Sequence, residues 1–211
     1  MPGVVNIGAI PSHMAQSFGI GDGFAFRDEF VDTEGTALTD HSPGGGFTWV
    51  NALGSMIISS NEASTDVDAV CVLSAGISEN VRVRTSRMVT NDNFSGFVMR
   101  YSDSNNFWIA GPDPFNGRWT IWKNVAGSFT NIAAASDSDV PTVSDTIVNF
   151  EAWCSSIDIA IYEDGILRLK STGDSFNDGA TIVGLYSDPN VATLTSWDDI
   201  YVYRIADGLT F

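Results

Sequence analysis

Short segments in which apolar and polar residues alternate, separated by turn residues, constrain the fold of this chain more than any other feature. Residues 96–108 predict two strands joined by a tight polar turn, with aromatic side chains in both strands. Residues 156–162 alternate with period two and are followed by Asp164-Gly165, a favoured two-residue hairpin turn, and then by the apolar run 166–170. The sequence therefore predicts an all-β protein built from hairpins.

Segments of the same character recur along the chain, and none shows a sustained helical period. The predicted strands are 24–30, 48–50, 55–59, 67–73, 80–88, 96–101, 106–110, 119–124, 128–132, 146–153, 156–162, 166–170, 181–186 and 200–205. The connecting segments 39–46, 111–118 and 133–145 are rich in Gly, Pro, Ser and Asp, which predicts loops and the places where a ligand would bind.

One predicted strand has a polar face. Val81, Val83 and Thr85 alternate with Arg82, Arg84 and Ser86. This pattern is typical of an antiparallel sheet whose one face packs inward while the other meets water.

The first 22 residues differ from the rest because they carry spaced glycines and no period of either kind. We predict an extended N-terminal arm over residues 1–22 that packs against its own domain or a neighbouring subunit. Residues 23–211 then form one domain, since a β-sandwich of this length does not need to divide.

The charge of the chain excludes several partners. It has 26 acidic and 10 basic residues, a formal net charge of −16, and only Arg27 is basic before Val81. Such a chain repels phosphate backbones and anionic lipids, so we expect no direct contact with nucleic acid and none with membranes. Residues 1–7 lack the basic start and apolar core of a secretory signal, so the protein is assembled in the cytoplasm or a signal has been removed.

Cysteine and histidine offer little catalytic chemistry. Cys71 and Cys154 lie in apolar strand-like runs, which predicts buried free thiols, with a single bridge between two strands as the alternative. His13 in the arm and His41 in a loop are predicted surface residues. No serine lies in a Gly-x-Ser-x-Gly elbow, so a nucleophilic triad is not expected.

A series of short motifs in a fixed order carries a family resemblance over residues 28–205. They are Asp28-Glu29-Phe30, Gly44-Gly45-Gly46 with Trp49, the hairpin 96–108, the turn Asp164-Gly165 between its strands, Gly184-Leu185-Tyr186-Ser187, and the closing run 196–202. Together they resemble the concanavalin A-like lectin/glucanase domain, in the laminin-G-like branch found in secreted modules and in virion proteins of tailed bacteriophages. The resemblance implies a two-sheet antiparallel jelly-roll sandwich.

Members of this family bind glycans, cleave glycans or serve as structural modules, so the residues must decide between these functions. The glucanase branch carries its catalytic acids on one strand as Glu-x-Asp-x-x-Glu, and this chain has no such pattern. We therefore expect no enzyme, and a divergent glycan hydrolase is the third hypothesis.

Two kinds of binding site are predicted. Laminin-G-like domains often hold one calcium ion at the rim of the sandwich, and the candidate ligands here are Asp103, Asn105, Asp198 and Asp199. Turn capping by Asp103, or pairing of Asp198 and Asp199 with Arg100 or Arg204, would explain the same aspartates.

The second predicted site binds glycans, which stack on exposed rings beside amide groups. The candidates for this role are Trp108, Trp119, Trp122, Phe115, Asn105, Asn106 and Asn116.

Most of these rings are expected in the core. Trp119 and Trp122 are three residues apart in one predicted strand, and side chains alternate between the two faces along a strand. One of the two rings therefore points outward.

The leading functional hypothesis is a non-enzymatic structural protein of a tailed-phage virion, either a capsid decoration protein or a tail or fibre component. It would form homo-oligomers and contact other virion proteins through its arm and sheet edges, with host-surface glycans as further partners. The alternative is a carbohydrate-binding, lectin-like module of a secreted or surface protein.

Overall fold

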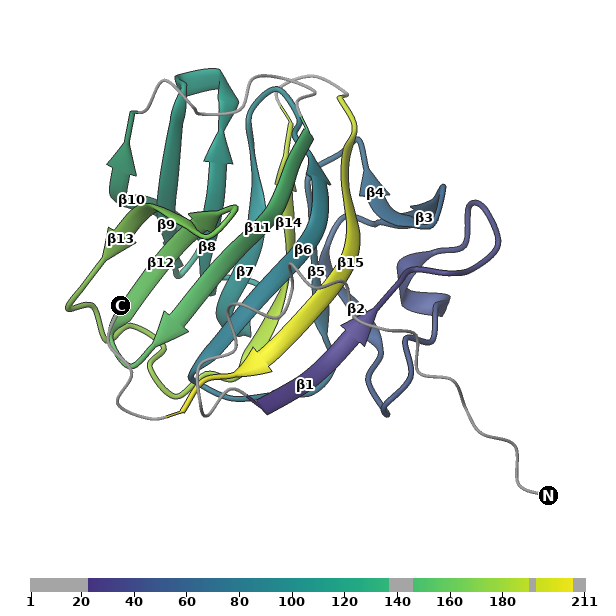
Figure 1. Ribbon diagram of the computed structural model, residues 1–211, viewed down its shortest axis with the longest axis horizontal. Coiled ribbons are helices and arrows are strands. Elements are labelled where there is room, and N and C mark those ends of the chain that lie inside the picture. Colours follow the sequence, from purple (N-terminus) through teal and green to yellow (C-terminus); the bar gives the residue numbers. More distant parts are fainter. Residues whose placement is uncertain (1–22, 137–145, 190–192, 207–211) are drawn as a thin grey trace.

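The structure is a computed structural model that describes residues 23–136, 146–189 and 193–206. These residues form two antiparallel β-sheets that pack face to face as a jelly-roll sandwich (Figure 1). The all-β prediction is confirmed, and all fourteen predicted segments overlap strands. The predicted arm, residues 1–22, and His13 within it lie outside the described residues.

Sheet A faces the viewer in Figure 1 and has the order β13-β12-β11-β6-β15-β4-β3, with β1 also paired to β15. The first part of β15 pairs with β4, and its second part pairs with β1. The strands of sheet A are β1 (Gly23–Asp28), β3 (Ile57–Ser59), β4 (Glu62–Thr65), β6 (Val81–Val89), β11 (Thr146–Ser155), β12 (Asp158–Glu163), β13 (Ile166–Ser171) and β15 (Thr195–Arg204).

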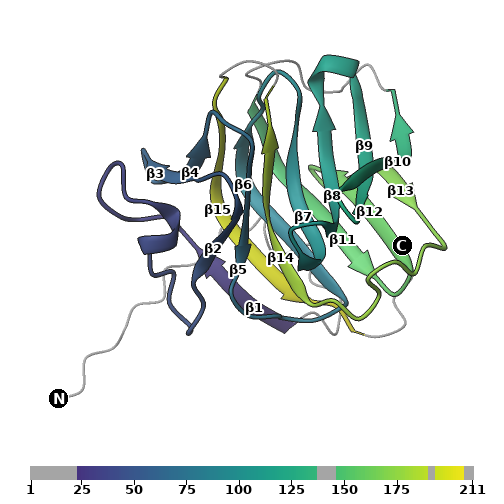
Figure 2. The ribbon, with the colours of Figure 1, turned by 180° about the vertical axis from the view of Figure 1, so that it is seen from behind.

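Sheet B faces the viewer in Figure 2 and has the order β10-β9-β8-β7-β14-β5-β2. Its strands are β2 (Trp49–Leu53), β5 (Ala69–Leu73), β7 (Phe94–Asp103), β8 (Asn106–Asp113), β9 (Arg118–Val125), β10 (Ser128–Ala135) and β14 (Ile182–Asp188). Two short 3₁₀ helices lie in the connections of the described part of the chain, η2 (Leu38–Asp40) and η3 (Pro114–Asn116). The predicted loop 111–118 is therefore shorter than expected, because β8 continues to Asp113.

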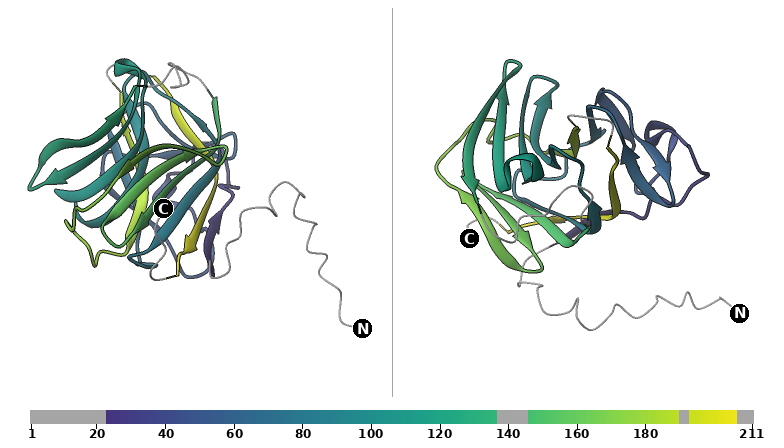
Figure 3. Two further views of the ribbon diagram at one scale, coloured as in Figure 1. Left: turned by 60° about the vertical axis from the view of Figure 1, so that its left-hand side comes forward. Right: turned by 90° about the horizontal axis from the view of Figure 1, so that it is seen from above.

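Figure 3 shows the two layers from two further directions. The hydrophobic core fills the space between these layers. Phe97 of sheet B stacks on Phe150 of sheet A, with ring centroids 4.9 Å apart and planes 9° apart. Trp119 stacks on the same Phe150 ring at 6.0 Å. Aromatic rings from the two sheets thus interlock across the sandwich, as the alternating strands require.

The outward face of β6 does not meet water as the sequence predicts. Val81 and Val83 do enter the core, but Arg82 on the opposite face is only 1% exposed. Its guanidinium carbon lies 5.2 Å from the ring centroid of Trp153 and 4.7 Å from that of Tyr203. Neighbouring aromatic side chains cover the arginine, a contact that alternation within one strand cannot predict.

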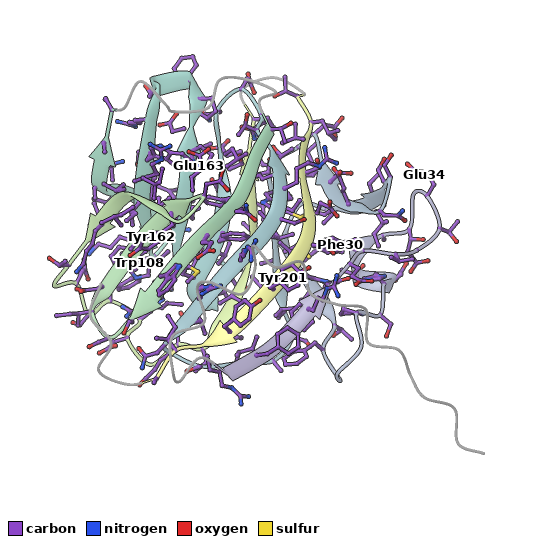
Figure 4. All side chains as sticks on the ribbon, viewed as in Figure 1. Phe30, Glu34, Trp108, Tyr162, Glu163 and Tyr201 are labelled. Atoms are coloured by element: carbon purple, nitrogen blue, oxygen red, sulfur yellow. The ribbon has the colours of Figure 1, made fainter. Side chains whose placement is uncertain are left out.

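The backbone pairing is interrupted in the middle of sheet A, although the register is the same on both sides of the interruption. The unpaired residues are Asn149 on β11, Ser86 on β6 and Asp199 on β15, which lie side by side on adjacent strands. Asn149 and Asp199 have positive φ values of 50° and 52°. Figure 4 shows the outer face of this sheet, with Tyr201 of β15 and Tyr162 of β12 labelled.

A buried carboxylate ties β1 to the segment that follows it. Asp28 is 2% exposed and accepts hydrogen bonds from the backbone N–H of Phe30 at 2.8 Å and from Trp49 Nε1 at 2.7 Å. His41 Nε2 lies 2.8 Å from the same carboxylate, and His41 Nδ1 lies 3.1 Å from Asp32. The prediction that His41 is a surface residue is wrong: it is 6% exposed because it is held between two carboxylates.

The two cysteines are buried free thiols, as predicted, and they lie in different sheets. Burial raises the pKa of Cys71 to about 12 and that of Cys154 to about 11. Within the part of the chain that the structure describes, no helix has the length and apolar character that a membrane span requires.

Candidate glycan-binding site on sheet B

The outer face of sheet B carries a second hydrophobic cluster, separate from the core. Alternate residues of β5, β7, β8 and β14 point to this face because residues i and i+2 of a strand share one side. The buried members are Val70, Val72, Phe94, Val98, Phe107, Ile109 and Tyr186, and Ala52, Tyr101, Trp122 and Ile182 pack against them. An aromatic surface on the outside of a sandwich is what a ring-stacking ligand requires.

This face is concave. Phe129 of β10 and Tyr186 of β14 are separated by the three strands β9, β8 and β7, which would place their backbones about 19 Å apart in a flat sheet. Their ring centroids are nevertheless 6.3 Å apart, and Phe129 also contacts Phe107 at 6.1 Å. The curl of sheet B therefore brings side chains from distant strands together over one hollow.

A pocket of about 340 Å³ opens at one end of this face, where β8 connects to β9 at the top of Figure 2. Pockets of this size hold small ligands. Rings and hydrogen-bonding groups alternate around it. Its lining residues are Asn93, Phe94, Asp113, Phe115, Asn116, Arg118, Trp122, Phe129, Tyr186 and Asp188.

The rim of the pocket is a tight turn held by Asp113. This carboxylate is 2% exposed and accepts hydrogen bonds from Asn116 N at 3.2 Å, from Asn116 Nδ2 at 2.9 Å and from Arg118 Nε at 2.9 Å. Gly117 ends the turn with φ of 57°, in the left-handed region. The turn leaves Phe115 68% exposed at its tip, so this ring is available to a ligand.

Asp188 lines the opposite wall of the pocket. Asp68 lies next to it at the start of the neighbouring strand, because Ala69 pairs with Ser187. Burial, followed by the nearby charge of Asp68, raises the pKa of Asp188 to about 6. Asp113 adds to this rise from across the pocket.

Two glycines lie next to each other on the outer face of β7 and β8, beside Tyr186, whose register partner is Gly96. A Cβ added to Gly96 would lie 2.2 Å from the carbonyl oxygen of Ala110, and one added to Gly111 would lie 2.0 Å from that of Ser95. The strands can approach this closely only without side chains at these positions. The outer face of sheet B therefore carries no side chain at these two positions.

The structure divides the predicted glycan residues into two groups. Trp122, Phe115 and Asn116 line the pocket together, which agrees with the expectation that one of Trp119 and Trp122 points outward. Trp108 and Trp119 are 1% and 0% exposed and belong to the core, so their prediction as ligand platforms is wrong. Sandwich packing needs these large inward rings.

Asn105 and Asn106 lie at the β7–β8 turn, the opposite end of β8 from Asp113. Asp103 accepts hydrogen bonds from Asn105 N at 2.8 Å and from Asn106 Nδ2 at 2.9 Å. Asn106 Oδ1 accepts one from Ala126 N at 3.1 Å. These amides hold the turn, and the structure does not bring them to the pocket.

The calcium candidates are also separated. Asp103 and Asn105 belong to a turn of sheet B, whereas Asp198 and Asp199 lie on β15 of sheet A. Asp199 accepts a hydrogen bond from Arg27 at 3.5 Å, and burial raises the pKa of Asp198. Among the described residues no group of three or more acidic, histidine or cysteine side chains could hold a metal ion. Calcium binding stays a prediction.

Several pocket residues were not predicted from the sequence. Asn93, Phe94, Phe129, Tyr186 and Asp188 come from β7, β10 and β14 or the residues beside them. Asp113 and Arg118 lie in the segment 111–118, which the sequence did single out as a place for a ligand. The alternation of side chains along each strand could have predicted that Phe94, Tyr186 and Asp188 share the outer face. The order of the strands, which brings these residues together, could not be predicted from the sequence.

Solved structures that resemble this chain are jelly-roll sandwich proteins. The carbohydrate-binding module CBM66 from Bacillus subtilis is 17% identical, with a TM-score of 0.53 over 74% of this chain and 92% of that one. BuGH16B is 11% identical, with a TM-score of 0.56 over 90% of this chain and 95% of that one. The GH43 protein BlXynB from Bacillus licheniformis is 11% identical, with a TM-score of 0.57, and this chain covers 39% of its length.

Identities this low establish the fold alone, which is the jelly roll that the sequence motifs predicted. No protein-family model matches the sequence, and no curated protein sequence matches it.

Proposed function

We propose that this protein is a carbohydrate-binding module that holds a sugar in the pocket at the β8–β9 end of sheet B. The observation that carries this proposal is the lining of the pocket, where the rings of Phe94, Phe115, Trp122, Phe129 and Tyr186 stand beside carboxylate, amide and guanidinium groups. Sugars present apolar C–H faces and polar hydroxyl edges, so they need both kinds of wall. The carbohydrate-binding module among the similar structures supports the proposal at the level of fold.

The acids of the pocket favour binding over hydrolysis. A glycosidase needs one carboxyl group as the acid and a second as the nucleophile or base, and the carboxyl groups that line this pocket are those of Asp113 and Asp188. Asp113 is occupied by Arg118 and Asn116, and no glutamate lines the pocket. We therefore propose that the protein is not an enzyme.

The test is a glycan array followed by calorimetry on any sugar that binds. Phe115→Ala removes an exposed ring from the rim and should weaken binding about tenfold, the effect of losing one stacked ring of roughly 1–1.5 kcal/mol. Trp122→Ala should weaken it further. Phe24→Ala is the matched control because Phe24 is 60% exposed on β1, in the other sheet.

Equal affinity of the Phe115→Ala, Trp122→Ala and Phe24→Ala variants would place the sugar elsewhere. Absence of binding across the array would contradict the proposed function.

The virion hypothesis has no comparable observation behind it. Its support was cumulative: the missing signal peptide and catalytic pair, the acidic charge, the family resemblance and the arm at residues 1–22. The arm lies outside the described residues, and homo-oligomer formation is likewise untested. The structural role, the virion localisation and the virion partners remain predictions, for which neighbouring capsid or tail genes would be the direct test.

A further inference from the structure

The middle of the outer face of sheet B is covered by the protein's own side chains. Val98 of β7 and Ile109 of β8 belong to the outer hydrophobic cluster, yet both are 0% exposed. Phe107, two residues from Ile109 on the same face of β8, is 1% exposed. A sugar ring cannot stack on this part of the face, because the surface that it would need is already in contact with protein atoms.

Three rings form a barrier across the same face, which we call the ring barrier. They are Phe129 of β10, Phe107 of β8 and Tyr186 of β14. Their centroids lie 6.1 Å apart for Phe129 and Phe107, 6.4 Å for Phe107 and Tyr186, and 6.3 Å for Phe129 and Tyr186. Rings at these separations are in contact, so no sugar ring can pass between them.

The ring barrier closes the pocket on the side of the β7–β8 turn. Phe129 and Tyr186 line the pocket, whereas Phe107 lies behind them and does not. Phe115 stands on the opposite side of the pocket, in the β8–β9 connection. Walls at both ends prevent a glycan chain from running through the pocket along the direction of the strands.

The pocket also has walls across the sheet. Trp122 lines it from β9 and Asp188 lines it from β14, and β8 and β7 lie between these two strands. The lining therefore surrounds a central position above β7 and β8. An internal residue of a glycan chain needs two exits from its binding site, one for each neighbouring sugar, whereas a terminal residue needs only one.

On the basis of the proposed function, we propose that the pocket binds the terminal sugar residue of a glycan and not an internal stretch of a chain. The terminal residue contacts the rings and polar groups of the lining. The rest of the glycan leaves through the mouth of the pocket into solvent, so it adds little to binding.

The dependence of affinity on chain length distinguishes the two modes of binding. In an open groove, each further sugar stacked on a ring would raise the affinity about tenfold. In a terminal pocket, a monosaccharide makes most of the contacts of the longer ligand. We therefore expect a monosaccharide and its trisaccharide to bind within about threefold of each other.

The experiment measures by calorimetry the binding of glucose, xylose, arabinose, galactose and fructose, and of a linear trisaccharide of each. Phe129→Ala removes one ring of the ring barrier and should raise the ratio of trisaccharide to monosaccharide affinity by about threefold or more, because the rings of Phe107 and Tyr186 become accessible. The ratio is measured because Phe129 also lines the pocket, and loss of its ring weakens both ligands.

Val125→Ala is the matched control for this ratio. Val125 is 36% exposed in the same β9–β10 hairpin and does not line the pocket. The variant should keep the wild-type ratio.

The outcomes separate the two proposals. A trisaccharide that binds about tenfold or more tighter than its monosaccharide, and loses affinity in Trp122→Ala, would overturn terminal binding and leave the proposed function intact. A ratio that is the same in Phe129→Ala and Val125→Ala would also overturn the inference, because the ring barrier would not limit the ligand. Failure of all the sugars to bind would overturn the proposed function and this inference with it.

A second measurement counts chain ends. A linear polysaccharide of the sugar that binds is partly hydrolysed, so that shorter chains carry more ends at equal mass. The amount of protein bound at saturation should rise in proportion to the number of ends. Saturation that depends on mass alone would show binding along the chain and would overturn the inference.

Discussion

Substitution of Asp28 by alanine should be among the most damaging single changes in this protein. The carboxylate is 2% exposed and accepts hydrogen bonds from Phe30 N at 2.8 Å and from Trp49 Nε1 at 2.7 Å. His41 Nε2 also lies 2.8 Å from it. Removing one member of a buried charged network typically costs about 3–5 kcal/mol, because the partners are left without hydrogen bonds. A domain of this kind has about 5–15 kcal/mol of stability in total, so the loss would be a large fraction of it.

The assay is urea unfolding monitored by tryptophan fluorescence, which gives the free energy of unfolding of each variant. The dependence of that free energy on urea concentration is compared between variants as well. Trp49→Phe removes one donor and should cost about 1–3 kcal/mol, less than Asp28→Ala. Asp32→Ala is the control, because Asp32 contacts the other nitrogen of His41 but is exposed, and its loss should be smaller still. Equal destabilisation by Asp28→Ala and Asp32→Ala would refute the argument that burial of the network sets the cost.

Two further predictions concern the sheets. Gly96→Ala should destabilise the protein by about 1–3 kcal/mol, since the new Cβ would lie 2.2 Å from the carbonyl oxygen of Ala110. A Cβ added at Gly179 meets nothing within 4 Å, so Gly179→Ala should be close to neutral in the same unfolding assay. Cys71 and Cys154, whose pKa values burial raises to about 12 and about 11, should not react with a thiol reagent in the native protein and should both react in guanidinium chloride. A native thiol that reacts at the rate of a small-molecule thiol would show that its strand opens.

The sequence predicted strands well wherever alternation and turn chemistry agree. Asp164 and Gly165 have φ values of 49° and 76°, the two positive angles that a two-residue hairpin turn needs, and the strands on either side begin and end within two residues of the prediction. The strand Glu62–Thr65 was missed because it has no apolar alternation. Its pairing with β15 and β3 stabilises it instead.

The pocket could be predicted only in part, and the reason is topological. Parity within one strand correctly separated Trp119 from Trp122, since that needs no knowledge of neighbouring strands. The meeting of Phe129 with Tyr186 depends on β14 lying between β7 and β5, and on the curl of the sheet. Neither property is local, so no periodicity within one segment could have revealed it.

The two outer faces of the sandwich differ in how their charged groups are paired, and this difference favours sheet B as the binding face. On sheet A, Arg168 bonds Glu163 at 2.8 Å, Lys170 bonds Asp158 at 3.1 Å, and Arg82 lies between two rings. A ligand there would have to break contacts that already balance one another.

On sheet B, the two acids that line the pocket outnumber its single guanidinium, and burial together with the nearby charge of Asp68 raises the pKa of Asp188. Sugar hydroxyl donors would stabilise the ionised form of Asp188, and the exposed ring of Phe115 would gain a partner without losing one. Binding energy is available where the free protein is left with unfavourable contacts, and in the described residues the pocket on sheet B combines such contacts with rings that can stack.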